Sequence, residues 1–378
     1  MRSSPCARSI RPMDSTPPEN AGGGRGRALL AARWRSGCEL LGTRHAILGG
    51  AMTWVSEHGL VAAISNAGGF GVIASGAMSP SLLDAEIART RDSTDQPFGV
   101  NIIIMHPELD ALIDVCGRRA VSHVVLAGGL PARAAIDRIR GHGAKALAFA
   151  PALAVARKLV RAGIDALIIE GMEAGGHTGP VATGVLAQEM LPEVTEVPVF
   201  VAGGIGRGVA VAMYLEMGAA GCQLGTRFVC ARESIAHPDF KKAFIRAHAR
   251  DAVLSVQVDP QFPVIPVRAL ANAASRRFAA TQREVIARYR GGEISQGDAQ
   301  LEIEHFWAGA LRRAVVDGDI ENGSLMAGQS VGMVTREQSA AEIIDELVGD
   351  AARALNRDRE SEPARALERP LIEAVSGG

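Results

Sequence analysis

Eight short apolar runs, each followed by a helical pattern, constrain the fold of this chain more than any other feature. The predicted strands are residues 46–48, 71–74, 99–104, 123–126, 145–149, 166–169, 197–202 and 221–224. The predicted helices between them are residues 55–66, 80–91, 107–116, 131–141, 151–162, 185–191 and 207–217. Apolar strands that alternate with helices are typical of a parallel sheet covered on both faces. Eight such units predict an α/β fold, a closed (β/α)8 TIM barrel, and the alternative is an open doubly wound sheet.

The rest of the chain of 378 residues divides by composition around this barrel. We expect a disordered N-terminal extension over residues 1–32, which are rich in Arg, Ser, Pro and Gly. The remaining expected units are the barrel over 33–235, a helical substrate-binding or lid subdomain over 236–323, a return segment with a C-terminal helix packed on the barrel over 324–358, and a flexible tail over 359–378.

Composition excludes several classes of function. Forty basic and 41 acidic residues give a net charge of −1, so the chain has no electrostatic signature of a nucleic-acid or membrane-surface protein. Five cysteines without a C-x-x-C pair argue against a disulfide framework or a zinc site and predict a reducing, cytoplasmic environment. No apolar run is long enough to span a bilayer.

The loop after the sixth strand is the first candidate for a functional site, because barrel enzymes carry their active sites at the C-terminal ends of the strands. It contains Glu170, Gly175, Gly176 and His177. Glycines let the backbone approach a flat or phosphorylated ligand, and a histidine exchanges protons near neutral pH. Considered alone, this segment is better explained as a plain strand-to-helix turn that carries a surface histidine, and the repeated pattern of strand and glycine in the rest of the chain favours a functional site.

The loops after the seventh and eighth strands add two glycine clusters where barrels commonly bind phosphate. Their candidate residues are Gly203, Gly204, Gln223, Gly225 and Thr226. The third strand contributes a buried amide, Asn101, whose partner is either a heteroaromatic ring or the backbone, and the first strand ends in Gly49-Gly50-Ala51-Met52. A flat heterocycle with one phosphate, flavin mononucleotide (FMN), fits this combination, and no residues show metal-ligand spacing.

Four segments resemble the nitronate monooxygenase family, formerly called 2-nitropropane dioxygenases, which includes the flavin-dependent enoyl-ACP reductases known as FabK. They are residues 170–177, 201–205, 223–228 and 326–329. The resemblance implies an FMN-binding (β/α)8 barrel with a small helical domain. By motif, His177 matches the active-site histidine, Gly203, Gly204, Gln223, Gly225 and Thr226 match the FMN phosphate loops, and Ala51, Met52 and Asn101 match positions that line the flavin. Two segments depart from the family: relatives usually have Gln-Gly-Gly-Met at residues 49–52, and residues 180–186 follow neither subgroup.

The resemblance leaves two enzymatic functions and one non-enzymatic function. The first is a nitronate monooxygenase that oxidises an alkyl nitronate with O2 to a carbonyl compound and nitrite, with His177 as base or as partner of the anion. The alternative is an enoyl-ACP reductase with NAD(P)H as co-substrate, towards which Met172 and residues 97–101 and 324–329 lean. A flavin-binding protein without turnover is the third. We take the monooxygenase as the narrow preference, while a quinone-type substrate and a homodimer stay open.

Overall fold

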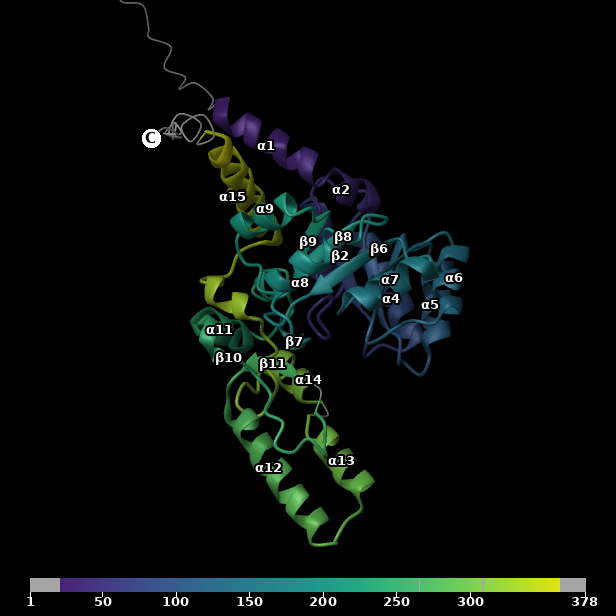
Figure 1. Cartoon of the computed structure of the whole chain (residues 1–378), viewed down its shortest axis with the longest axis vertical. Helices are drawn as coiled ribbons and strands as arrows, with labels where there is room; N and C mark the ends of the chain where they lie inside the picture. The colour runs from purple at the N-terminus through teal and green to yellow at the C-terminus, as the bar shows by residue number, and fades with distance from the viewer. Residues whose placement is uncertain (1–20, 265, 308, 361–378) are drawn as a thin grey trace, which may run out of the picture.

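A closed barrel of eight parallel strands forms the centre of the computed structural model, which describes residues 21–264, 266–307 and 309–360 (Figure 1). The strands follow one another around the barrel in the order of the chain. They are β1 (Ile47–Gly49), β2 (Phe70–Ala74), β3 (Gly99–Ile103), β4 (His123–Ala127), β5 (Lys145–Phe149), β6 (Ala166–Glu170), β8 (Val199–Ala202) and β9 (Gly221–Leu224). The predicted TIM barrel and all eight of its predicted strands are confirmed.

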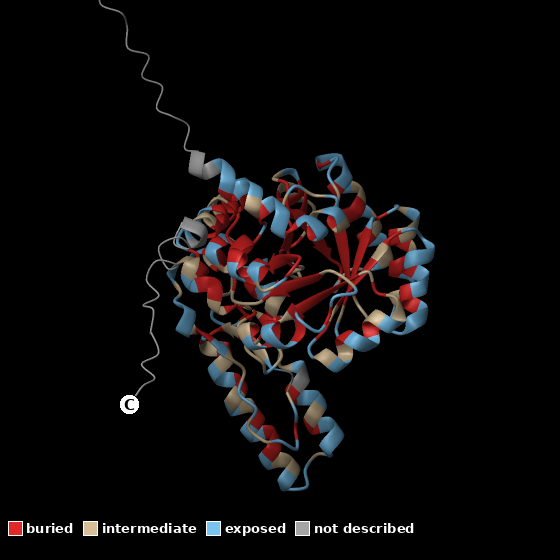
Figure 2. Cartoon of the chain, turned by 45° about the horizontal axis from the view of Figure 1, so that its top comes forward, coloured by how far each residue is buried: buried red, intermediate tan, exposed pale blue. Residues whose placement is uncertain are grey.

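Helices surround the barrel because each strand is apolar on both faces and both faces must be covered. They are α3 (His58–Asn66), α4 (Pro80–Ser93), α5 (Leu109–Arg118), α6 (Arg133–Gly141), α7 (Leu153–Ala162), α8 (Thr183–Met190), α9 (Gly208–Glu216) and the short α10 (Thr226–Val229). Local signals set their starts: Ser79 accepts a hydrogen bond from the Leu82 N–H, and Pro80 occupies the first turn of α4. Figure 2 shows buried strands beneath helices whose outer faces are exposed.

A second, three-stranded sheet lies outside the barrel. It has the order β10-β11-β7, formed by β10 (Ala252–Leu254), β11 (Val267–Leu270) and β7 (Gly176–His177), with antiparallel pairing throughout. The sequence did not predict these strands, because runs of two to four residues carry too little alternation to be recognised.

A helical arm extends away from the barrel (Figure 1). The helices of this region are α11 (Pro238–Arg246), α12 (Ala273–Arg290), α13 (Gln296–His305) and α14 (Ala310–Val315). The arm has its own hydrophobic cluster, which includes Phe262, Phe278 and Ile303 and is separate from the barrel core. Gln282 is buried in this arm, where it donates to the Val256 carbonyl and accepts from the Val258 N–H. The range 236–323 thus contains these helices together with β10 and β11, and its assignment as a substrate-binding or lid subdomain stays a prediction.

The two ends of the described chain pack together, and they correct one expectation. Helix α1 (Ala21–Arg33) leads into α2 (Arg35–Leu41), and α15 (Ala340–Glu360) lies beside α1 (Figure 1). Disorder over residues 1–32 is therefore wrong for residues 21–32; residues 1–20 lie outside the described chain. The expected tail, 359–378, also lies outside it, except for the two residues that end α15.

Close packing explains why a glycine-rich segment is helical here. A Cβ at Gly26 would lie 2.3 Å from the Ala352 carbonyl oxygen, so the absent side chain lets α1 approach α15 directly. Leu30 is buried in the same interface region. Tertiary contacts thus outweigh the low helix propensity of glycine. Within the described residues, no helix is both long and apolar enough to cross a membrane.

Candidate functional site

The loop after β8 forms a cradle in which glycine is required twice. Gly203 has φ +100° and Gly204 has φ +70°, a region that residues with a side chain rarely adopt. A Cβ at Gly203 would also lie 3.0 Å from the Gly171 carbonyl oxygen. The loop leads into α9, which begins at Gly208. Backbone N–H groups at the start of such a helix, unobstructed by side chains, suit a phosphate group.

A return segment, Met326-Ala327-Gly328-Gln329, locks the loop after β6 against the loop after β9. The Gly328 N–H donates to the Thr226 hydroxyl at 2.9 Å, and the Gln329 N–H donates to the Glu173 carbonyl oxygen at 2.9 Å. A Cβ at Gly175 would lie 2.6 Å from the Gly328 nitrogen. The structure therefore brings together Gly175 and Thr226, which the sequence separates by about fifty residues.

Thr183 joins the loop after β6 to the loop after β8 and was missed by the sequence analysis. Its backbone N–H and its hydroxyl lie 2.8 and 2.7 Å from one carboxylate oxygen of Glu173, and the hydroxyl is also 3.2 Å from the Gly203 carbonyl oxygen. Glu173 is therefore a structural carboxylate that caps the start of α8. A Thr immediately before a helical pattern is the signal that could have identified this role.

Glu170 is the last residue of β6 and lies at the same level of the barrel as Gln223 of β9. Strand register places Glu170 beside Ala202 and Ala202 beside Gln223, so these side chains leave the sheet on the same side. Although Glu170 is half-buried as a residue, burial of its carboxyl group raises its pKa to about 8. A carboxyl group with this pKa holds its proton near neutral pH and can donate a hydrogen bond.

The loop after β1 meets the loop after β9. The side chain of Gln223 packs within 3.3 Å of where a Cβ on Gly50 would lie, and a Cβ on Gly225 would lie 3.5 Å from the sulfur of Met52. Ala51 and Met52 are half-buried at this edge. The predicted ring-lining and phosphate-binding residues therefore adjoin one another here.

Asn101 has the backbone partner that the sequence left open. Its Nδ2 donates to the Val125 carbonyl oxygen on the neighbouring strand at 3.0 Å, while Oδ1 takes no part in that bond. The side chain is buried in the middle of β3, which β4 and β5 separate from β6 in the order of strands. The structure records no direct contact between Asn101 and His177 among the described residues.

His177 lies on β7 and not in an irregular loop. It pairs with Val267 of β11, and Gly176, with φ +78°, pairs with Arg268. The imidazole is exposed along part of its surface, yet surrounding protein atoms desolvate it and lower its pKa. A histidine with a lowered pKa is neutral at pH 7, so it can donate a hydrogen bond from one ring nitrogen and accept one at the other.

Arg268 fixes the segment before His177 and was also missed. It is buried, and its Nε donates to the Met172 carbonyl oxygen at 2.9 Å while Nη1 donates to the Ala252 carbonyl oxygen at 2.6 Å. Desolvation lowers its pKa, which the nearby Glu173 opposes. A single arginine in a short strand carries no sequence signal of this role.

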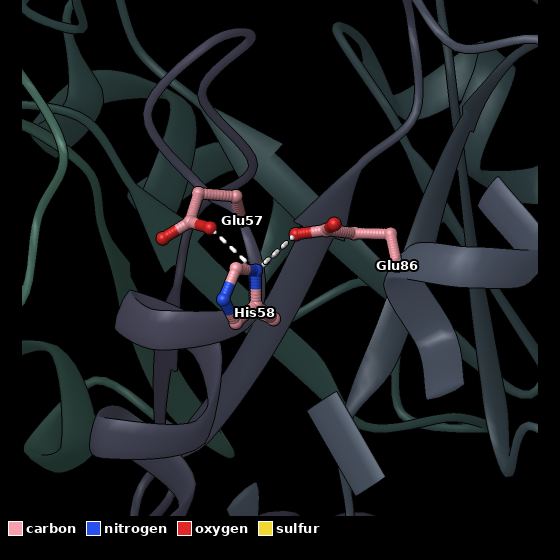
Figure 3. A group of neighbouring side chains, drawn as sticks. All are labelled: Glu57, His58 and Glu86. Atoms are coloured by element: carbon pink, nitrogen blue, oxygen red, sulfur yellow. Dashed lines mark hydrogen bonds and ion pairs between the residues drawn. The ribbon is translucent and has the colours of Figure 1, made fainter. Parts of the chain in front are cut away.

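Glu57, His58 and Glu86 form a separate cluster of metal-ligand type within the described chain (Figure 3). His58 Nδ1 lies 2.6 Å from Glu57 and 2.9 Å from Glu86, whose carboxylate also accepts the His58 backbone N–H. Ion pairing and capping at the start of α3 already occupy these groups. The cluster thus joins α3 to α4, and its spacing of 28 residues hid it from motif analysis.

The site residues fit a cofactor with a phosphate and a flat ring. The turn at Gly203 and Gly204 leaves room for a phosphate group, and Gly225 and Thr226 adjoin the edge formed by Met52 and Gln223. The Thr178 hydroxyl, next to His177, is buried without a hydrogen-bond partner among the described residues. Such a group is typical of a site that a ligand completes.

Comparison with known proteins agrees with this geometry. A family model for nitronate monooxygenase matches residues 36–116 and 109–350. The chain is 33% identical over 342 residues to (3aS,4S,5R,7aS)-5-hydroxy-7a-methyl-1-oxo-octahydro-1H-indene-4-carboxyl-CoA dehydrogenase of Mycobacterium tuberculosis, covering 83% of this chain and 94% of that protein. It is 27% identical over 368 residues to a nitronate monooxygenase of Paraburkholderia phytofirmans, covering 85% and 96%.

Two solved structures extend the comparison. FabK from Thermotoga maritima is similar with a TM-score of 0.77 and 36% identity, covering 85% of this chain and 97% of that chain. A nitroalkane oxidase from Streptomyces ansochromogenes is similar with a TM-score of 0.69 and 28% identity, covering 84% and 98%. The chain is therefore an oxidoreductase of the nitronate monooxygenase family.

Proposed function

We propose that this enzyme binds FMN and transfers hydride equivalents to or from the acyl part of a thioester. The observation that supports the proposal is the buried Thr178 hydroxyl next to His177, which has no hydrogen-bond partner among the described residues and lies in the segment that Gly328 joins to Thr226. The relatives named as FabK and as a carboxyl-CoA dehydrogenase, at 36% and 33% identity, support a thioester substrate.

The cofactor would be held at both ends by residues already described. Backbone groups of Gly203, Gly204 and Gly225 with the Thr226 hydroxyl would bind the phosphate, and residues 51–52, Asn101 and Gln223 would line the ring. Bound FMN would supply the capacity to accept or give a hydride. Glu170, protonated near neutral pH, would present a hydrogen-bond donor to the ring or to the substrate.

His177 would act on the substrate. Reduction of an α,β-unsaturated thioester adds a hydride at the β-carbon and a proton at the α-carbon. A neutral imidazole N–H would donate a hydrogen bond to the thioester carbonyl oxygen and stabilise the charge that develops there. Because a neutral imidazole is not an acid near pH 7, the proton added at the α-carbon would come from solvent. In the dehydrogenase direction the neutral imidazole would accept the proton from the α-carbon.

Nitronate oxidation, the preference from sequence, is the second candidate. The family model and the nitronate monooxygenase relatives favour it. We place the thioester first because the proteins named FabK and carboxyl-CoA dehydrogenase are 36% and 33% identical to this chain, whereas the nitronate monooxygenase of Paraburkholderia phytofirmans is 27% identical.

Anaerobic mixing distinguishes the candidates. The purified protein should release FMN on heating, and NADH or NADPH should bleach the bound flavin, with crotonyl-CoA then restoring its absorbance. A saturated acyl-CoA that bleaches the flavin would indicate the dehydrogenase direction. Bleaching by propyl-2-nitronate, with no response to either nucleotide or to any thioester, would overturn the thioester proposal. A preparation that releases no flavin would overturn both candidates.

A further inference from the structure

Trp54 occupies a backbone conformation that a tryptophan rarely adopts. The Val55 N–H donates to the Met52 carbonyl oxygen at 2.9 Å, which closes a turn with Trp54 as its third residue, and Trp54 has φ +69°. Glycine or asparagine normally takes this position. The Ser56 hydroxyl holds the turn from within, because it accepts from the Met52 N–H and donates to the Gly50 carbonyl oxygen. These hydrogen bonds hold the backbone of Trp54 in the same loop as Ala51 and Met52.

Packing does not account for this aromatic residue. Of the three tryptophans, Trp34 is 3% exposed in the main core, and Trp307 contacts the rings of Phe278 and Phe306 in the arm. Trp54 is 36% exposed and has no aromatic partner among the described residues. A strained conformation that is kept for an exposed ring indicates a role in function.

A cation lies over the Trp54 ring. The guanidinium carbon of Arg312, from α14, is 5.9 Å from the ring centroid. Arg312 forms an ion pair with Asp317, in which Nη1 lies 3.1 Å from a carboxylate oxygen. About half of the arginine side chain is exposed. The barrel loop and the helical arm therefore contribute an aromatic surface and a phosphate-binding type of side chain to one place.

We propose that Trp54 and Arg312 bind an adenosine diphosphate group, with the indole stacked on adenine and the guanidinium paired with a phosphate. This inference rests on the proposed function, whose candidate reactants, coenzyme A thioesters and NAD(P)H, both carry that group. Aromatic side chains stack on any base, and arginine binds phosphate through two parallel hydrogen bonds. An acyl chain alone would gain nothing from the cation.

The variant Trp54→Gly tests the ring without breaking the turn, because glycine adopts φ +69° freely. Arg312→Gln tests the charge. Met105→Ala is the control, because Met105 is an exposed apolar residue that follows β3. For each FMN-loaded protein, KM and kcat are measured with crotonyl-CoA and with crotonyl-pantetheine, which lacks the nucleotide. NADH is compared in the same way with reduced nicotinamide mononucleotide.

For Trp54→Gly we expect KM to rise about tenfold for the nucleotide-bearing reactant only, with little change in kcat. A rise in the coenzyme A pair assigns the site to the thioester, and a rise in the NADH pair assigns it to the dinucleotide. Calorimetric titration with adenosine 3′,5′-bisphosphate and with ADP-ribose gives a second readout that needs no turnover. Met105→Ala should leave unchanged the ratio of KM for the nucleotide-bearing reactant to KM for its nucleotide-free counterpart, in both pairs.

The inference is overturned if Trp54→Gly and Arg312→Gln keep the wild-type KM ratios and bind both nucleotide fragments as the wild type does. It is also overturned if the variants lose affinity for nucleotide-bearing and nucleotide-free reactants alike. Failure of the proposed function looks different, because then no thioester and no reduced nucleotide reacts with the flavin in any of the proteins.

Discussion

Replacing Glu170 with Gln should remove a pH dependence from the stability of the flavin-free enzyme. Burial raises the pKa of this carboxyl group from 4.5 to about 8 in the folded state. Between these values the folded chain holds a proton that the unfolded chain has released, so stability falls as pH rises from about 5 to 8. One group of this kind changes the free energy of unfolding by at most about 1.4 kcal/mol per pH unit. Because the residue is half-buried, we expect about 1 kcal/mol per unit.

Urea denaturation at pH 5.5, 6.5 and 7.5 measures this difference directly. Between the lowest and the highest pH, the free energy of unfolding of Glu170→Gln should rise by about 2 kcal/mol relative to that of the wild type. Asp84→Asn is the control, because the Arg119 side chain holds the pKa of Asp84 below its usual value and that group releases its proton below this pH range. Wild-type and Glu170→Gln curves that stay parallel across the three pH values would refute a protonated carboxyl group at Glu170.

Three further substitutions test the site and the fold. His177→Gln should retain FMN but lower kcat by about a hundredfold, measured as flavin per chain and steady-state rate; a rate within twofold of the wild type would exclude His177 from proton transfer or substrate polarisation. Gly203→Ala should reduce the amount of FMN bound per chain. The control is Gly218→Ala, because Gly218 also has a positive φ but a Cβ there would meet nothing within 4 Å, so this variant should strain the backbone and still bind the flavin. Equal flavin content in both variants would contradict a phosphate cradle at Gly203. Gly26→Ala should lower the thermal midpoint through a clash costing about 1–3 kcal/mol, while Gly24→Ala, in open space on the same helix, should not lower it.

The barrel was predictable because its strands are short, mostly apolar runs that alternate with helical patterns. Residues such as Ile168 and Val201 are buried, and burial of this kind leaves a strong mark on sequence. The glycine clusters that follow the strands were predictable for a related reason, since the positive φ at Gly203 and Gly204 excludes most other residues.

The parts that sequence did not reveal depend on partners distant in the chain. β7 is a strand only because β11 pairs with it about ninety residues later. Arg268 is a positioning residue only because the Met172 and Ala252 carbonyl groups meet it. Helix α1 forms where packing on α15 outweighs a glycine-rich composition. Local propensity contains no information about such contacts.

The histidine and the proposed cofactor cradle belong to different sheets, and this division has a consequence for substitutions outside the barrel. The cradle grows from barrel strands, whereas His177 is registered against Val267 from the region that also builds the arm. Strand β11 therefore helps to set the position of His177 relative to the barrel strands. We expect a substitution in β11 to displace His177 while the backbone turn at Gly203 and Gly204 stays in place.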